Sequence, residues 1–167
     1  MIRRVAAVAI AAAVSLAAPA VAAAPPVKLT RFGVGKVRVG AKHSTLRAKG
    51  VLGPKIPGCE LSGPDTRAAK LTNGAKGVAD LTRQDPRRVR SIVITGGATA
   101  MGVGFEDGRT AIEEKFPHAK FDPSTQEVFG ITLVTIPKRD GGRFQIGIDT
   151  QTEEISVMGV PFIAFCE

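Results

Sequence analysis

The chain has 167 residues, a mass of 17.4 kDa and a formal net charge of +8, with 44% apolar and 23% charged residues. This length is sufficient for one compact domain or two small repeats, and it excludes a large multidomain enzyme. The balance of apolar and charged residues also excludes a disordered or fibrous chain. The positive charge is typical of proteins with anionic partners, and the cellular compartment of the protein determines which anionic partners it can meet.

The N-terminus is typical of a secretory signal peptide. Arginines at positions 3 and 4 precede an apolar run over residues 5–18, and small residues follow. This order of basic, apolar and small residues is that of a cleavable export signal. We therefore expect residues 1–23 to be a Sec-type signal peptide, and the mature chain to be secreted, periplasmic or located in the cell envelope. The apolar run is shorter than the roughly 20 residues of a transmembrane helix, so we expect no retained membrane span.

A short helix followed by a β-meander is predicted for residues 28–98. A Val-Gly pair at 39–40 leads into the helix, with Ser44 as its expected N-cap and Gly50 at its end. Strands are expected at residues 67–71, 78–82 and 89–95, with turns at 73–74 and 84–87. The intervening stretch 51–64 is rich in Pro and Gly and is expected to be irregular.

The same pattern recurs in residues 99–167. A second Val-Gly pair at 103–104 leads into a helix with Asp107 as its expected N-cap and Pro117 after its end. Strands are expected at residues 128–136, 144–149 and 155–160, with a turn at 138–142.

The two segments align at a nearly constant offset. Leu46 and Ile112 are 66 residues apart in the sequence, as are Val89 and Ile155. We therefore predict an α+β fold of two tandem repeats, each a short helix packed on a three- or four-stranded antiparallel β-meander. The alternative is one continuous α+β sheet whose halves are similar by accident.

Two tandem helix-plus-meander units, each opened by one of these Val-Gly pairs, resemble the architecture of the β-lactamase-inhibitory proteins and of small exported actinobacterial proteins. The resemblance covers residues 28–167. It implies a binding or inhibitor-like module. That family binds through aromatic side chains, whereas this chain has no Tyr and no Trp, so none of the family's binding residues is transferred.

Cys59 and Cys166 are the two cysteines of the chain. Because export delivers a protein to an oxidising compartment, we expect them to form one disulfide. The bond would close a loop of about 107 residues and stabilise the fold by about 4–5 kcal/mol through the lower entropy of the unfolded chain. The alternatives are a reactive thiol and an intermolecular bridge.

The sequence contains few residue patterns that indicate a catalytic site. Two histidines, His43 and His118, do not form a ligand cluster, so we predict no metal site. The Gly-Val-Gly triplets at 33–35 and 102–104 are interpreted as turns rather than a dinucleotide loop, so no cofactor is predicted. The acidic pairs 106–107 and 113–114 are interpreted as a helix N-terminus and a solvated helix face. We therefore predict that the protein is not an enzyme.

The distribution of charge differs between the two predicted repeats. Residues 25–98 contain 15 Lys and Arg against four Asp and Glu, whereas residues 99–167 contain six against eleven. The densest basic run consists of Arg83, Arg87, Arg88 and Arg90, which we expect to flank an exposed turn and to bind a partner. Anionic envelope polymers and acidic protein surfaces fit this charge. Nucleic acid is not expected, since stacking aromatic residues are lacking.

These features together predict an exported, non-catalytic binding or inhibitor-like module that contacts an anionic envelope or protein partner. We expect the chain to be a monomer. The alternative function is that of a structural or stress-related cell-envelope protein without a specific site.

Overall fold

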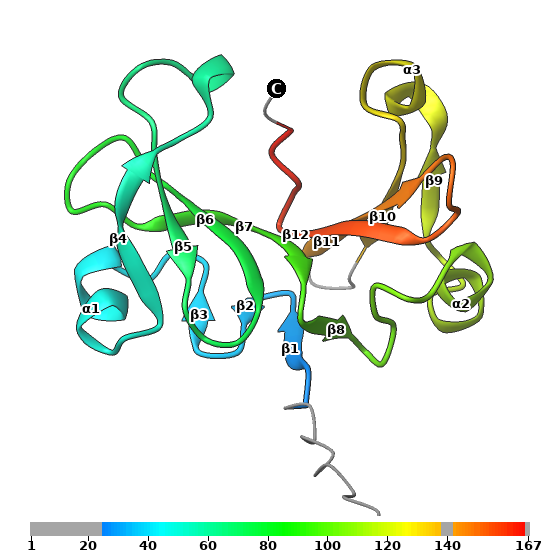
Figure 1. Ribbon diagram of the computed structural model, residues 1–167, viewed down its shortest axis with the longest axis horizontal. Helices are drawn as coiled ribbons and strands as arrows, with labels where there is room; N and C mark the ends of the chain where they lie inside the picture. Colours follow the sequence, from blue (N-terminus) through cyan, green and yellow to red (C-terminus); the bar gives the residue numbers. More distant parts are fainter. Residues whose placement is uncertain (1–24, 138–141, 166–167) are drawn as a thin grey trace, which may run out of the picture.

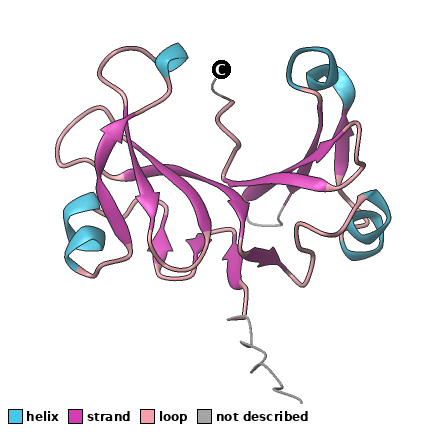
Figure 2. Cartoon of the chain, in the orientation of Figure 1, coloured by secondary structure: helices cyan, strands magenta, loops and turns pink. Residues whose placement is uncertain are grey.

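A computed structural model describes residues 25–137 and 142–165 (Figure 1). The predicted signal peptide, residues 138–141 of the predicted turn, and Cys166 lie outside these ranges. The described part of the chain consists mostly of strands in two sheets, with few and short helices, which confirms the α+β prediction (Figure 2). No helix within these ranges is long and apolar enough to span a membrane.

Eight antiparallel strands form the larger sheet, in the order β4-β5-β6-β7-β12-β11-β10-β9. Their bounds are β4 Leu52–Pro57, β5 Arg67–Leu71, β6 Lys76–Leu81, β7 Val89–Gly96, β9 Lys120–Asp122, β10 Ile131–Pro137, β11 Arg143–Asp149 and β12 Ile155–Val160. At the centre, β7 pairs with β12 through Ile94 opposite Met158 and Ile92 opposite Val160. The strands of residues 52–96 therefore lie on one side of this junction, and those of residues 120–160 lie on the other.

The smaller sheet has four short strands in the order β3-β2-β1-β8. They are β1 Val27–Thr30, β2 Gly33–Val34, β3 Val37–Arg38 and β8 Ala98–Ala100. The helical elements are α1 His43–Ala48, α2 Arg109–Lys115 and α3 Gln126–Phe129, with 3-10 turns η1 Glu60–Ser62 and η2 Pro123–Thr125. Helices α1 and α2 and the smaller sheet lie on one face of the larger sheet, and the C-terminal segment leaves from the other face (Figure 1).

Apolar side chains at alternate strand positions form the core on the helix side of the larger sheet. In β11, Phe144, Ile146 and Ile148 are all buried, as the period-two pattern requires. Leu46 of α1 and Ile112 of α2 belong to the same apolar cluster. Burial of this surface stabilises the fold by roughly 25 cal/mol per Å² of apolar area.

Two strand predictions are confirmed to the residue, since β5 and β12 have the predicted bounds. Two predictions are wrong. The stretch 51–64 was expected to be irregular, yet β4 forms there as an edge strand, where proline is tolerated because one row of N–H groups needs no partner. Val128 was expected to begin a strand, but it lies in α3.

The predicted helix caps are also wrong. The N-cap of α1 is Lys42, without a side-chain hydrogen bond, and Ser44 lies inside the helix. The N-cap of α2 is Gly108, and the Asp107 carboxylate accepts a hydrogen bond from the backbone of the preceding loop instead. The predicted end of α1 is confirmed, because Gly50 follows it with a φ of +66°, a conformation that glycine adopts without strain.

Candidate functional site

The four arginines predicted to bind a partner lie on, and just after, the turn that joins β6 to β7. The side chain of Arg87 is only 16% exposed. Its Nη1 donates hydrogen bonds to the carbonyl oxygens of Asp65, at 3.2 Å, and Thr82, at 3.1 Å. Arg83 donates through Nη2 to the carbonyl oxygen of Ser62. These two arginines therefore hold the loop around η1 against the turn.

The other two arginines also contact their own chain. Arg88 Nη1 donates to the carbonyl oxygen of Gly40 at 2.8 Å, just before α1. The Arg90 guanidinium lies 5.2 Å from the ring centroid of Phe162, within the range of a cation–π contact. The arginines flank an exposed turn, as expected, but the side chain of Arg87 is mostly buried and bonded. Arg83, Arg88 and Arg90 are exposed, but each has an acceptor or a ring within the molecule.

A buried polar pair lies beside Arg90. The Ser91 hydroxyl is fully buried and donates to Oδ2 of Asp80 at 2.8 Å. Burial raises the pKa of Asp80 above its usual range, while the Ser91 hydrogen bond and the Arg90 charge act in the opposite direction. The cavity next to this pair has a volume of about 10 Å³, which is enough for no more than one water molecule. The pair is therefore a packed element of the fold rather than a ligand site.

A second group of cations lies around α1. Lys42, Arg47, Lys49 and Lys55, which we call the α1 basic cluster, are all exposed. Within the described ranges none of the four has an ion pair or a side-chain hydrogen bond. Arg47 and Lys55 line one shallow hollow of about 520 Å³ between α1 and β4, together with His43, Ser44 and Ala48. No acidic side chain lines this hollow, so its surface presents uncompensated positive charge.

The two histidines differ in environment. His43 is buried, and its Nε2 lies 3.1 Å from the carbonyl oxygen of Gly53, so the ring ties α1 to β4. His118 is exposed in the loop after α2. Among the described residues there is no group of three His, Cys, Asp or Glu side chains that could hold a metal ion.

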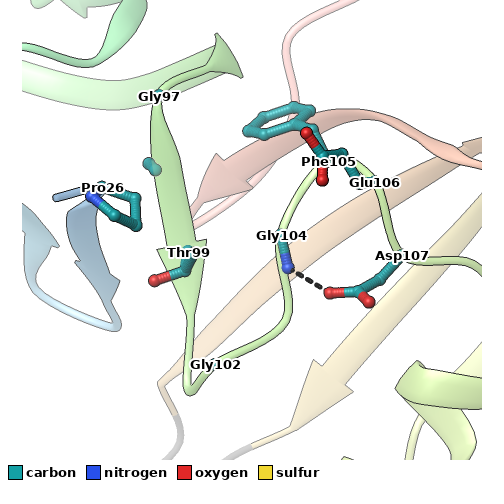
Figure 3. Close-up of a pocket in the computed structure, with 9 residues that line it drawn as sticks. Pro26, Gly97, Thr99, Gly102, Gly104, Phe105, Glu106 and Asp107 are labelled. Carbon is teal, nitrogen blue, oxygen red and sulfur yellow. Dashed lines mark hydrogen bonds between the residues drawn. The ribbon is translucent and has the colours of Figure 1, made fainter. Parts of the chain in front are cut away.

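A cavity of about 380 Å³ lies between β8 and the loop that leads to α2 (Figure 3). Its lining comprises Pro26, Gly97, Ala98, Thr99, Gly102, Gly104, Phe105, Glu106 and Asp107. Oδ2 of Asp107 accepts a hydrogen bond from the Gly104 N–H at 2.7 Å, which fixes the loop. The Gly102 φ of +94° agrees with the interpretation of the second glycine triplet as a turn. The lining contains no cationic or imidazole group that could work with these carboxylates in proton transfer.

Cys59 lies close to the end of the described chain. Its Sγ is 3.7 Å from the carbonyl oxygen of Phe165, the residue that precedes Cys166 in the sequence. Because Cys166 lies outside the described residues, the Cys59–Cys166 disulfide stays a prediction.

No protein-family model, no curated protein and no solved structure matches the chain.

Proposed function

We propose that the chain is an exported, non-catalytic binding module, built of two tandem helix-plus-meander repeats, whose basic first repeat contacts an anionic partner. The α1 basic cluster carries this proposal. It replaces the run from Arg83 to Arg90 as the main contact surface, because those arginines are already bonded within the chain.

Contacts at a common offset of 66 residues support the tandem repeat. Lys42 forms an isolated β-bridge with Arg88, and Gly108 forms one with Glu154, so both partners are displaced by the same number of residues. The bond from the Val89 N–H to the Ala41 carbonyl recurs as that from Ile155 to Asp107. In this alignment Leu46 of α1 corresponds to Ile112 of α2, and both side chains are buried. These hydrogen bonds belong to the β-bridges, so bridge and bond are one paired contact; its recurrence at the offset that also separates Leu46 from Ile112 favours duplication over accidental similarity.

The charge of the α1 basic cluster supports an anionic partner. Four cations around one short helix, without acidic neighbours in the adjacent hollow, create a local positive potential. Such exposed charges raise association rates and set partner choice more than they raise affinity, and they are screened over roughly 8–10 Å at physiological salt. We therefore expect modest binding that weakens steeply as salt rises. An acidic protein surface and an anionic envelope polymer both satisfy this requirement.

The proposal is tested with two labelled polyanions, poly-L-glutamate for carboxylates and polyphosphate for phosphates, by fluorescence anisotropy at low and high salt. The test variant is Arg47→Ser, Lys49→Ser and Lys55→Ser in one chain. We expect the Kd to rise by at least about tenfold at low salt, because three rim charges are lost. The polyanion that binds more tightly identifies the chemical class of the partner.

The matched control removes the same charge elsewhere in the first repeat, through Lys28→Ser, Lys36→Ser and Lys76→Ser, three exposed positions outside the cluster. It should leave the Kd within about twofold once salt screens long-range charge. Binding that is indifferent to salt, or equally reduced by both triple variants, would overturn the proposal. Absence of binding to either polyanion would favour the structural envelope protein instead.

A further inference from the structure

A polar cavity of about 270 Å³ lies in the second half of the molecule, residues 99–165. Its walls come from the first residue of α2, the loop around η2 and α3, and the turn that joins β11 to β12. Among the lining residues are Arg109, Gln126, Thr132, Asp149 and Glu153. Pockets that hold drug-sized ligands measure roughly 300–1,000 Å³, so this smaller cavity fits one polar side chain or a small molecule.

Two carboxylates give the cavity an excess of negative charge. Among the described residues, the Glu153 carboxylate has no ion pair and no side-chain hydrogen bond. Two backbone N–H groups of the same turn donate to Oδ1 of Asp149, at 2.8 and 3.0 Å, which leaves Oδ2 as an acceptor. The cation of the lining, Arg109, is already paired with Glu113 at 3.4 Å. The cavity therefore favours a cationic group that donates hydrogen bonds.

The first half of the molecule, residues 25–98, contains an equivalent place. Glu153 precedes Glu154, whose bridge to the start of α2 corresponds to the bridge of Arg88 to the start of α1. Arg87 precedes Arg88 in the same way. Arg87 and Glu153 therefore occupy equivalent positions in the β6–β7 and β11–β12 turns.

In the first half this place is filled by the Arg87 guanidinium. Its Nη1 donates to the carbonyl oxygens of Asp65 and Thr82, and its Nε lies 3.9 Å from the Asp85 carboxylate. The guanidinium thus lies between the hairpin turn and the loop around η1. In the second half the corresponding space, between the hairpin turn and the loop around η2 and α3, is the open cavity.

We infer that this cavity binds the guanidinium group of an arginine side chain from a basic protein segment. The first half shows such an occupant as part of its own chain, and the second half has a carboxylate, Glu153, where the first half has Arg87. A guanidinium presents five N–H donors in a planar fork, which matches carboxylate oxygens. The inference rests on the repeat equivalence within the proposed function. It goes beyond that function, because the ligand is a cation and the site lies in the second half.

The probe is the peptide acetyl-Gly-Arg-Gly-amide, which is titrated into the isotope-labelled full chain and followed by NMR. The matched ligand carries citrulline, which has nearly the same shape as arginine but no charge. We expect a millimolar Kd for the arginine peptide, because one partly exposed ion pair contributes little affinity. The citrulline peptide should bind at least about fivefold more weakly, since charge-assisted hydrogen bonds are the stronger ones. The shifted amide signals should lie in residues 123–132 and 149–154.

The test variant is Glu153→Gln, which keeps the shape of the side chain and removes its charge. It should raise the Kd of the arginine peptide at least about fivefold. The matched control is Glu154→Gln, which alters the adjacent exposed carboxylate outside the cavity lining. Its Kd should stay within about twofold at physiological salt, where distant charges are screened.

A second variant, Glu153→Arg, gives the second half a guanidinium of its own at the position of Arg87. Because this side chain fills the cavity, peptide binding should be lost while the fold is retained. The inference is overturned if the arginine peptide does not bind, if the citrulline peptide binds equally well, or if the two glutamine variants weaken binding to the same extent. Binding that survives in folded Glu153→Arg also contradicts it.

The two proposals are tested separately. The triple variant of the α1 basic cluster should bind the arginine peptide as the unaltered chain does, and Glu153→Gln should leave the salt-dependent binding of polyanions unchanged. Failure of polyanion binding would therefore remove the proposed anionic partner without affecting the peptide result.

Discussion

The halves on either side of the β7–β12 junction are held by different interactions. In the first half, arginine side chains bond to backbone carbonyls, as Arg87 does to Asp65 and Arg88 to Gly40. In the second half, rings perform the corresponding role. Phe116 packs edge-on against Phe144 with centroids 5.5 Å apart, and the Arg109 guanidinium lies 4.3 Å above the Phe121 ring.

This difference changes how the charge asymmetry is to be understood. Much of the positive charge of the first half stabilises its own loops, because guanidinium groups satisfy carbonyl oxygens that strands and helices leave unpaired. Net charge therefore overstates the surface available to a partner. The cations of the α1 basic cluster are among those that remain available, since none of the four has an internal acceptor within the described ranges.

The largest expected effect tests whether the halves share one core. Leu46→Ala and Ile112→Ala remove buried side chains from α1 and α2, at positions that the proposed repeat aligns. Each should lower the free energy of unfolding by about 2–5 kcal/mol, since a cavity replaces packed methyl groups. Urea denaturation followed by circular dichroism measures both values. A loss for one variant with no loss for the other would break the equivalence of the two helices.

An intermediate effect tests the arginine contacts of the first half. Arg87→Ala leaves the carbonyl oxygens of Asp65 and Thr82 without their donor and should lower the free energy of unfolding by about 1–3 kcal/mol. Arg87→Lys should not restore it, because an ammonium lacks the planar fork of the guanidinium. Arg47→Ala, which removes an exposed cation of the α1 basic cluster, is the control and should stay within about 0.5 kcal/mol. Equal losses for Arg87→Ala and Arg47→Ala would show that Arg87 has no such role.

Sequence patterns predicted most strands of the larger sheet and missed the very short strands and the one that contains proline. β5 and β12 were located to the residue, whereas β4 was missed because Pro54 and Pro57 are typical of loops. Strands of two or three residues, such as β2 and β3, contain too few positions for a period to be visible.

The candidate site was harder to predict than the fold. A dense basic run is visible in the sequence, but the acceptors of Arg83 and Arg88 lie 21 and 48 residues away, and only tertiary structure brings them together. The four cations of the α1 basic cluster lie in α1, at its two caps and in β4, so they do not form one continuous basic run in the sequence. The sequence shows the excess of basic residues in residues 25–98. It does not show which of these residues lie together on a surface without acidic neighbours.

The smallest expected effect is a pH-dependent contrast between one carboxylate in each half. Burial raises the pKa of Asp80 in the first half, whereas hydrogen bonds from the Ser124 side chain and backbone lower the pKa of Asp122 in the second. A raised folded-state pKa means that the contribution of Asp80 to stability is full below its unfolded pKa and is lost as the pH rises through its folded pKa. A lowered one means that the contribution of Asp122 is present above its unfolded pKa and is lost as the pH falls through its folded pKa.

Substitution by asparagine should therefore act in opposite directions at neutral pH. Asp80→Asn keeps an acceptor for the Ser91 hydroxyl and removes a partly buried charge, so the melting temperature at pH 7 should rise slightly. Asp122→Asn weakens the hydrogen bond to the Ser124 N–H, which is 2.9 Å long, so the melting temperature at pH 7 should fall slightly. Both differences should shrink as the pH approaches 3, where the carboxyl groups become protonated. Scanning calorimetry at pH 3, 5 and 7 measures the contrast, and a stabilising effect of Asp80→Asn that grows toward acid pH would contradict the assignment of burial as the dominant influence on Asp80.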